Sequence, residues 1–220
     1  MSFCRKKRGE WMLTSIRNNL FILLIAICAV QCRTREVSVA APPAEEFCTG
    51  DLAFRLGRTL ESDAIAATAD EGYDYSHVGI IISQGDSIRV IHIEPERGGE
   101  ERIKCETLED FFHPTRAVKG CVARQKNISS NEIQSIEDKC ISLSNSNIRF
   151  DHDYSLQDSE AMYCTELVNV VFSEIGISLT ERRHKVPLIE EGVILPSDML
   201  RDGDLEIVWR YSERRPARHN

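Results

Sequence analysis

The chain has 220 residues, of which 42% are apolar and 28% are charged, and its formal net charge is −8. A single domain of roughly 100–200 residues with an N-terminal appendage accounts for this length, which excludes two large catalytic domains. The acidic balance argues against a nucleic-acid-binding protein, because binding to phosphates needs a basic surface that displaces counterions. We therefore expect no nucleic-acid partner.

The N-terminus has the layout of a secretory signal peptide. A basic stretch precedes the apolar run LFILLIAICAV, which spans residues 20–30. This run is shorter than the roughly 20 residues that a permanent membrane-spanning helix needs. Met12 makes a more conventional start for such a signal than Met1. We therefore expect an exported protein.

The apolar run ends in AVQC, which resembles the lipobox of bacterial lipoproteins and makes Cys32 the candidate lipidation site. Gln31 departs from the small residue that usually precedes that cysteine. Cleavage by an ordinary signal peptidase, for instance after Ala40, is the first alternative. A hydrophobic N-terminal core helix is the second, and the basic flank disfavours it. We expect a lipid-anchored protein in the periplasm or at the outer membrane, with membrane contact only through this anchor or signal.

Composition also predicts the domain boundaries. Residues 1–32 form the signal peptide, and residues 33–46 lack periodicity, as is typical of a linker. The folded domain then spans residues 47–213, and a short basic tail covers residues 214–220. The sequence does not predict the oligomeric state.

Five of the eight cysteines lie beyond the signal segment: Cys48, Cys105, Cys121, Cys140 and Cys164. Export exposes thiols to an oxidising compartment, so disulfides are expected, although the sequence does not dictate their pairing. If the first four pair, the last one is left as a free thiol. The cysteine and histidine spacings do not match a zinc site, and we expect no metal and no cofactor.

Taken in chain order, the segments of the first half of the domain predict an antiparallel sheet. A buried strand covers residues 49–57, and a short helix follows over 62–70, capped by Ser62 or Asp63. Two β-branched runs, 75–83 and 87–95, flank Gln-Gly-Asp, which is typical of a tight hairpin turn. The remaining elements of this half are a strand that passes into a short helix within 101–114 and a strand over 117–125.

The second half predicts two longer helices. In residues 129–145, Ile133, Ile136, Cys140 and Leu143 recur at helical spacing on one face, and Ser130 or Asn131 is the expected cap. A buried helix begins at or next to Cys164 and ends at Gly176. Residues 195–211 add one helical turn and a last strand. Antiparallel strands with separate helices indicate an α+β domain.

Cys164 is the candidate nucleophile. A thiolate is the nucleophilic form of cysteine, and the N–H groups and dipole of a helix start favour negative charge on a sulfur and on a developing oxyanion. A cysteine at a helix start is also an ordinary small buried residue. The assignment therefore depends on a partner base.

His77 is the candidate base. Strand alternation places it at the head of the SHVGIII run on the same face as Gly79, which leaves room beside the ring. On the next strand, His92 and Glu94 are two residues apart and share a face. Either of them could orient the His77 imidazole, as the third member of a catalytic triad does.

Together these residues resemble the permuted papain-like amidases of the YaeF/YiiX type, which are related to NlpC-type cysteine peptidases. The matching segments span most of the chain beyond the linker: GDLAFRLG, AIAAT, YSHVGIII, VIHIEPERGG, RFDHDY, YCTELV and LPSDML. A histidine ahead of the cysteine in chain order is what circular permutation implies. The resemblance implies a circularly permuted papain-like (NlpC-type) fold, with an antiparallel sheet packed against helices.

The resemblance also implies roles for individual residues. Cys164 matches the nucleophile and His77 the base, and Tyr154 matches an aromatic position of the substrate cleft. The third polar position falls on His92, where the family usually has glutamate, so Glu94 stays as the alternative.

The implied function is a cysteine hydrolase of the bacterial cell envelope. It would cleave an amide bond in a cell-wall peptide or an N-acyl amino acid, so that its partner is a peptide or small-molecule substrate. Two alternatives remain open: a lipid-directed acyltransferase or esterase, and a non-catalytic envelope binding module.

Overall fold

A computed structural model describes residues 42–85, 87–96, 98–155, 160–186 and 189–212. The predicted signal peptide, its lipidation site Cys32, most of the linker and the basic tail lie outside the described residues. Among the described helices, none combines the length and the apolar character that crossing a membrane requires.

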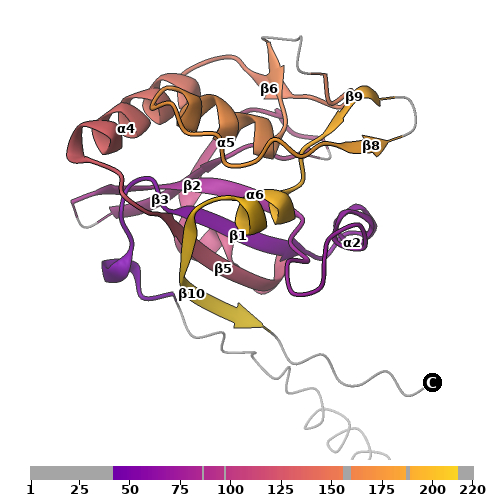
Figure 1. The fold of residues 1–220 in the computed structure, drawn as a ribbon, viewed down its shortest axis with the longest axis horizontal. Coiled ribbons are helices and arrows are strands. Elements are labelled where there is room, and N and C mark those ends of the chain that lie inside the picture. The colour runs from indigo at the N-terminus through magenta and orange to yellow at the C-terminus, as the bar shows by residue number, and fades with distance from the viewer. Residues whose placement is uncertain (1–41, 86, 97, 156–159, 187–188, 213–220) are drawn as a thin grey trace, which may run out of the picture. The chain divides into compact units, whose positions relative to one another are not determined.

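A six-stranded antiparallel sheet forms the centre of the domain, in the order β10-β5-β1-β2-β3-β4 (Figure 1). Its strands are β1 (Leu52–Gly57), β2 (His77–Gln84), β3 (Ser87–His92), β4 (Lys104–Thr107), β5 (Ala117–Gln125) and β10 (Leu205–Ser212). The two β-branched runs pair as the predicted hairpin, with Ile80 opposite Ile91. β1 lies between β2 and β5, and all six of its residues are buried.

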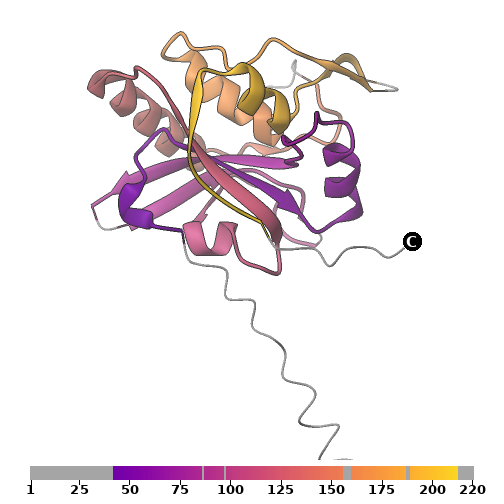
Figure 2. The same ribbon diagram turned by 60° about the horizontal axis from the view of Figure 1, so that its bottom comes forward.

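Helices cover both faces of this sheet unequally. They are η1 (Ala44–Glu46), α2 (Leu60–Ala66), α3 (Leu108–Phe111), α4 (Ser130–Ser144), α5 (Cys164–Ser173) and α6 (Pro196–Asp202). The last three lie together on one face, as Figures 1 and 2 show. Their apolar side chains share a core with Leu52, Phe54 and Ile80, whereas α3 packs on the opposite face against Ala53 and Ile81. Because side chains alternate between the two faces of a strand, the sheet contributes apolar residues to a core on each face. The predicted α+β architecture is confirmed.

Several boundaries differ from the predicted ones. The cap of α4 is Ser129, which forms a capping box with Glu132, rather than Ser130 or Asn131. The α2 helix starts earlier than predicted and is capped by Thr59. In both cases the chosen residue accepts a hydrogen bond from the N–H three positions later, which is the geometry of an N-cap.

Two small sheets were not predicted. β6 (Arg149–Phe150) pairs in parallel with β7 (Ala161–Met162), and β8 (His184–Val186) pairs antiparallel with β9 (Ile189–Val193). The β6–β7 pair immediately precedes α5 and so positions its first residue. Strands this short show no alternation of apolar and polar residues from which the sequence could predict them.

The five cysteines of the described chain are all free thiols. Cys48 and Cys105 are exposed, Cys121 and Cys140 are buried, and Cys164 is partly exposed. The expectation of disulfides is therefore wrong for the described residues, and the conditional argument that pairing of the other four leaves Cys164 free does not apply. Its candidacy depends on its surroundings.

Candidate active site

Cys164 is the first residue of α5. The preceding Tyr163 occupies the N-cap position, and its backbone N–H donates a hydrogen bond to Oε2 of Glu166 in the first turn of the helix. By contrast, α2, α3 and α4 each begin after a Thr or Ser that caps them. In the first turn of α5, the N–H groups of Cys164 and Thr165 favour negative charge on the sulfur.

The thiol of Cys164 lies against the start of β2. Backbone N–H groups of Val78, Thr165 and Cys164 itself favour negative charge on the sulfur. The Val78 N–H belongs to the peptide group that follows His77, so the candidate nucleophile lies beside the main chain of the candidate base. Burial raises the pKa of the thiol to about 11, and these N–H groups and the charge of Arg55 oppose that rise. The resting group is thus a neutral thiol, contrary to the thiolate that a helix start alone would favour.

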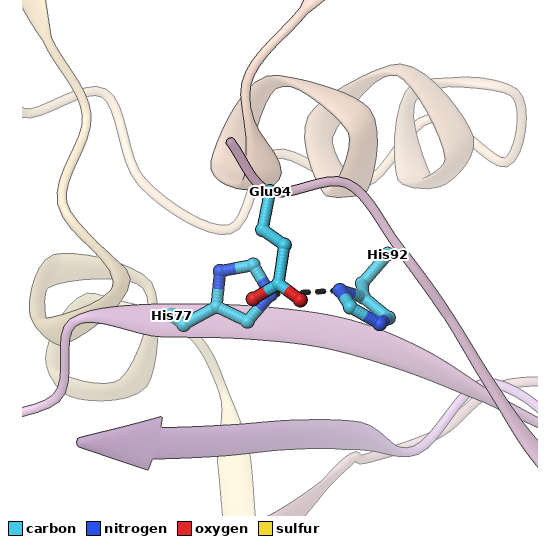
Figure 3. Close-up of side chains that lie close together, drawn as sticks. All are labelled: His77, His92 and Glu94. Carbon is cyan, nitrogen blue, oxygen red and sulfur yellow. Dashed lines mark hydrogen bonds between the residues drawn. The ribbon is translucent and has the colours of Figure 1, made fainter. Parts of the chain in front are cut away.

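His77 and His92 meet side chain to side chain. Nε2 of His77 and Nδ1 of His92 are 2.9 Å apart and share a hydrogen bond, which leaves Nδ1 of His77 on the side of its ring away from His92 (Figure 3). The rings are nearly perpendicular, and Phe111 of α3 packs against both. Both histidines are buried, with exposed fractions of 8% and 0%. This packing leaves the His77 ring little freedom to turn.

Burial sets the protonation of the two histidines. It lowers the pKa of His77 well below 6.5, and the charge of Arg55 adds to the effect. Burial also lowers the pKa of His92, although its contact with Glu106 works in the opposite direction. Both rings are therefore neutral at neutral pH, which is the form in which an imidazole accepts a proton.

Gly79 makes room for this pair. A Cβ at that position would lie 2.6 Å from Cγ1 of Val90 and 2.9 Å from Cβ of His92. The sequence argument assigned this space to His77, and the structure shows that the neighbouring strand fills it instead. The absence of a side chain at Gly79 leaves room for His92, on the neighbouring strand β3, to contact His77.

Glu94 is engaged with cations. Its carboxylate forms ion pairs with Arg55, Lys104 and Arg116. Burial alone would raise the pKa of Glu94, but the positive charges around the carboxylate, including those of Arg55 and Arg116, outweigh burial and lower that pKa. The carboxylate lies near the histidine pair (Figure 3), yet the side chain that shares a hydrogen bond with His77 is His92.

Glu106 of β4 stands on the far side of His92. Its Oε1 is 2.9 Å from Nε2 of His92, and its Oε2 is 2.7 Å from Nη1 of Arg116. Burial would raise the pKa of this carboxyl, but the hydrogen bond to His92 and the charge of Arg116 lower it to about 2. The carboxylate is therefore ionised at neutral pH. The sequence argument missed this residue, although alternation along β3 and β4 puts it on the face of His92.

Tyr154, the candidate substrate-cleft residue, lies close to the start of α5. Its ring centroid is 5.2 Å from that of Tyr163, and its hydroxyl is 3.4 Å from Oε1 of Glu61. The residue has a φ of 53°, a left-handed conformation that is uncommon for tyrosine. Tyr154 therefore combines an unusual backbone with a half-buried ring beside the residue that precedes Cys164.

His77, His92 and Glu94 also form a group that could hold a metal ion, since their ligand atoms lie within 4.8 Å of one another. Two imidazoles and a carboxylate are a donor set that zinc accepts. However, the Glu94 charge is already offset by three cations, and the buried guanidinium of Arg55 would repel a further positive charge. The residues as arranged therefore do not fit a metal ion well.

Comparisons with known proteins bear on the fold and the family of this chain. Among solved structures, the chain is similar to the crystal structure of the metalloprotein yiiX from Escherichia coli O157:H7, with a TM-score of 0.62 and 20% sequence identity. The similarity covers 76% of this chain and 98% of that one, which confirms the fold. No curated protein matches the sequence. The family model of the permuted papain-like amidase enzymes, YaeF/YiiX, C92 family, matches residues 46–209.

The order of the site along the chain, with the histidine strand before the cysteine helix, is the one that a permuted papain-like fold requires. With the family match over most of the described residues, it leads to one conclusion: the chain belongs to the YaeF/YiiX (C92) family of permuted papain-like amidases.

Proposed function

We propose that the protein is a cysteine hydrolase that cleaves an amide bond, with Cys164 as nucleophile and His77 as base. One observation carries the proposal: a thiol at a helix N-terminus lies beside the peptide that follows His77, whose ring is held by His92. Nucleophile, base and orienting residue are the parts that this chemistry needs. His92 acts as a positioning residue, since it contacts the base and not the sulfur.

The neutral resting state sets the order of proton transfers. As the sulfur attacks the carbonyl carbon, the thiol proton passes to Nδ1 of His77, and backbone N–H groups at the start of α5 stabilise the oxyanion. His77 then donates the proton to the leaving amine, and a thioester forms on Cys164. A water molecule attacks the thioester, His77 takes its proton, and the acid product leaves with the free thiol restored.

We propose a bacterial envelope setting, because residues 1–32 have the layout of an export signal with Cys32 at a lipobox-like position. A cell-wall peptide or an N-acyl amino acid is the substrate class that suits this setting. The related yiiX is a metalloprotein. In this chain Arg55 and the other cations around Glu94 disfavour an ion at the corresponding group, and no step of the proposed reaction uses one.

The test is to incubate the purified protein with muropeptides, N-acyl amino acids and phospholipids, and to identify the products by mass spectrometry. We expect hydrolysis of an amide in one of the first two classes, unaffected by a chelator and lost in Cys164→Ala. Cys48→Ala is the matched control, because it removes an exposed thiol from a different element. Acyl transfer to or from the lipid would instead support a transferase. Absence of turnover on every class, with the protein folded, would support a binding module.

A further inference from the structure

The histidine pair can exist in two arrangements that differ only in proton positions. In one, Nε2–H of His77 donates to Nδ1 of His92, and Nδ1 of His77 keeps a lone pair. In the other, Nδ1–H of His92 donates to Nε2 of His77, and the proton of His77 sits on Nδ1. Only the first arrangement allows Nδ1 of His77 to accept the thiol proton. The pair by itself does not select between them, because each imidazole can donate from either nitrogen.

We propose that Glu106 selects the productive arrangement and is a positioning residue of this active site. Its Oε1 faces Nε2 of His92 at 2.9 Å. A carboxylate can only accept a hydrogen bond, so it requires the proton of His92 to be on Nε2. Nδ1 of His92 is then a bare acceptor, which requires the proton of His77 to be on its own Nε2. This inference rests on the proposed function of His77 as the base.

The surroundings of Nε2 of His92 and Oε1 of Glu106 favour a hydrogen bond between these two atoms. The His92–Glu106 contact has hydrogen-bond length but poor alignment, and neither atom forms another hydrogen bond among the described residues. Leaving both buried and unpaired costs about 1–3 kcal/mol for each group. A small rotation of either side chain aligns the bond, and such bonds often tighten only when substrate binds.

The register of the sheet places Glu106 beside His92, and two arginines lie next to its carboxylate. In the β3–β4 register, Glu106 is opposite Val90 and therefore on the same face as His92. Oε2 of Glu106 accepts from Arg116, and Arg55 lies 3.8 Å from Oε1. Glu94 cannot take over this role in the observed arrangement, because its oxygens are occupied by cations.

The direct test is nuclear magnetic resonance of the protein with ¹⁵N-labelled histidine, since two-bond correlations show which ring nitrogen carries the proton. We expect Nε2–H tautomers for both His77 and His92 in the resting enzyme, assigned with single His→Gln variants. In Glu106→Leu, His92 loses its acceptor, and we expect a mixture that includes Nδ1–H forms of both rings. A wild-type His92 protonated on Nδ1 would overturn the proposal.

Kinetics provide the second test. We expect kcat to fall about 100-fold in Glu106→Leu with KM nearly unchanged, because a misplaced proton removes the base and leaves substrate contacts intact. Glu106→Gln should recover part of the loss, since its amide oxygen can still accept from His92. Arg116→Gln is the matched control: it removes the same ion pair but keeps the carboxylate on His92, so kcat should change much less.

The outcomes separate this inference from the function on which it depends. The tautomer measurement needs no substrate, so it stands even if the proposed hydrolase activity fails. If Cys164→Ala abolishes turnover while Glu106→Leu retains the parent kcat and tautomers, the nucleophile assignment stands and the role of Glu106 is refuted. Equal losses of kcat in Arg116→Gln and Glu106→Leu would also refute it, because the effect would then come from the ion pair.

Discussion

At the scale of single residues, the site is built from groups whose burial keeps them neutral. The thiol of Cys164 has its pKa raised to about 11, and the His77 imidazole has its pKa lowered. A stable thiolate–imidazolium pair is therefore not the resting state. The charge separation belongs to the reaction itself, when the oxyanion and the helix N–H groups can share it.

This burial predicts a dependence of stability on pH. His77 and His92 have pKa values below 6.5 in the folded protein, so the unfolded chain binds more protons once the pH falls below that value. The free energy of unfolding should therefore decrease as the pH drops below about 6.5. Urea denaturation between about pH 8 and pH 5 measures it, and His77→Gln should reduce the decrease. An identical slope in the variant and the parent would show that burial does not shift this histidine.

The candidate residues that the sequence indicates are those with a local signal. Cys164 is proposed from its place before an apolar helix, and His77 from its place at the head of a β-branched run. Glu106 has no such signal, because its proposed role depends on the register between β3 and β4. It also lies far from Cys164 in the sequence, so no local motif contains both residues. The high pKa of the thiol was also missed, since it depends on how deeply α5 packs against β2.

At the scale of elements, the long strands were predictable and the shortest ones were not. β2, β3 and β5 follow from β-branched runs bounded by turn residues. The two-residue strands β6 and β7 exist because the chain before α5 is held by tertiary contacts. Helix caps were misplaced by one or more residues because Ser and Thr occur side by side, as in Ser129 and Ser130, and only the three-dimensional structure selects one.

The close approach of Val90 and His92 on β3 to Gly79 on β2 predicts a link between stability and activity. Gly79→Ala would place a methyl group against Val90 and His92, so we expect a loss of about 1–3 kcal/mol in the free energy of unfolding. We also expect kcat to fall, because His92 moves away from His77. Ile136→Val in α4 is the control, since it costs about 0.5–1.5 kcal/mol in the core on the other face of the sheet from Val90. A Gly79→Ala enzyme with the parent kcat would contradict the role of this close approach.

At the scale of the whole molecule, the described domain is held together without disulfides. Two apolar cores, one on each face of the sheet, account for its packing, and five free thiols are spread among its elements. The fold class was predictable because the order of strands and helices along the chain already implied an antiparallel sheet with separate helices. The expectation of disulfides is wrong for the described residues, because it was based on the oxidising compartment of an exported protein and not on the positions of the cysteines in the fold.

Free thiols predict that reductants leave the fold unchanged. The midpoint of thermal unfolding should be the same with and without dithiothreitol, and thiol titration of the denatured protein should count every cysteine of the described domain as reduced. A disulfide that closes a long loop typically contributes about 2–4 kcal/mol. A clear drop of the midpoint in reductant would therefore show that a pair forms in solution.

The central claim is that Cys164 is the nucleophile, and labelling by an electrophilic amide analogue tests it most directly. Because Cys48 and Cys105 are exposed thiols, the measurement uses a Cys48→Ala/Cys105→Ala background and maps the adduct by peptide mass spectrometry. We predict one adduct, on Cys164, that forms about 100-fold more slowly in His77→Ala and is absent in Cys164→Ala. Labelling of the Cys164→Ala protein at the parent rate, together with retained amide turnover, would contradict the account.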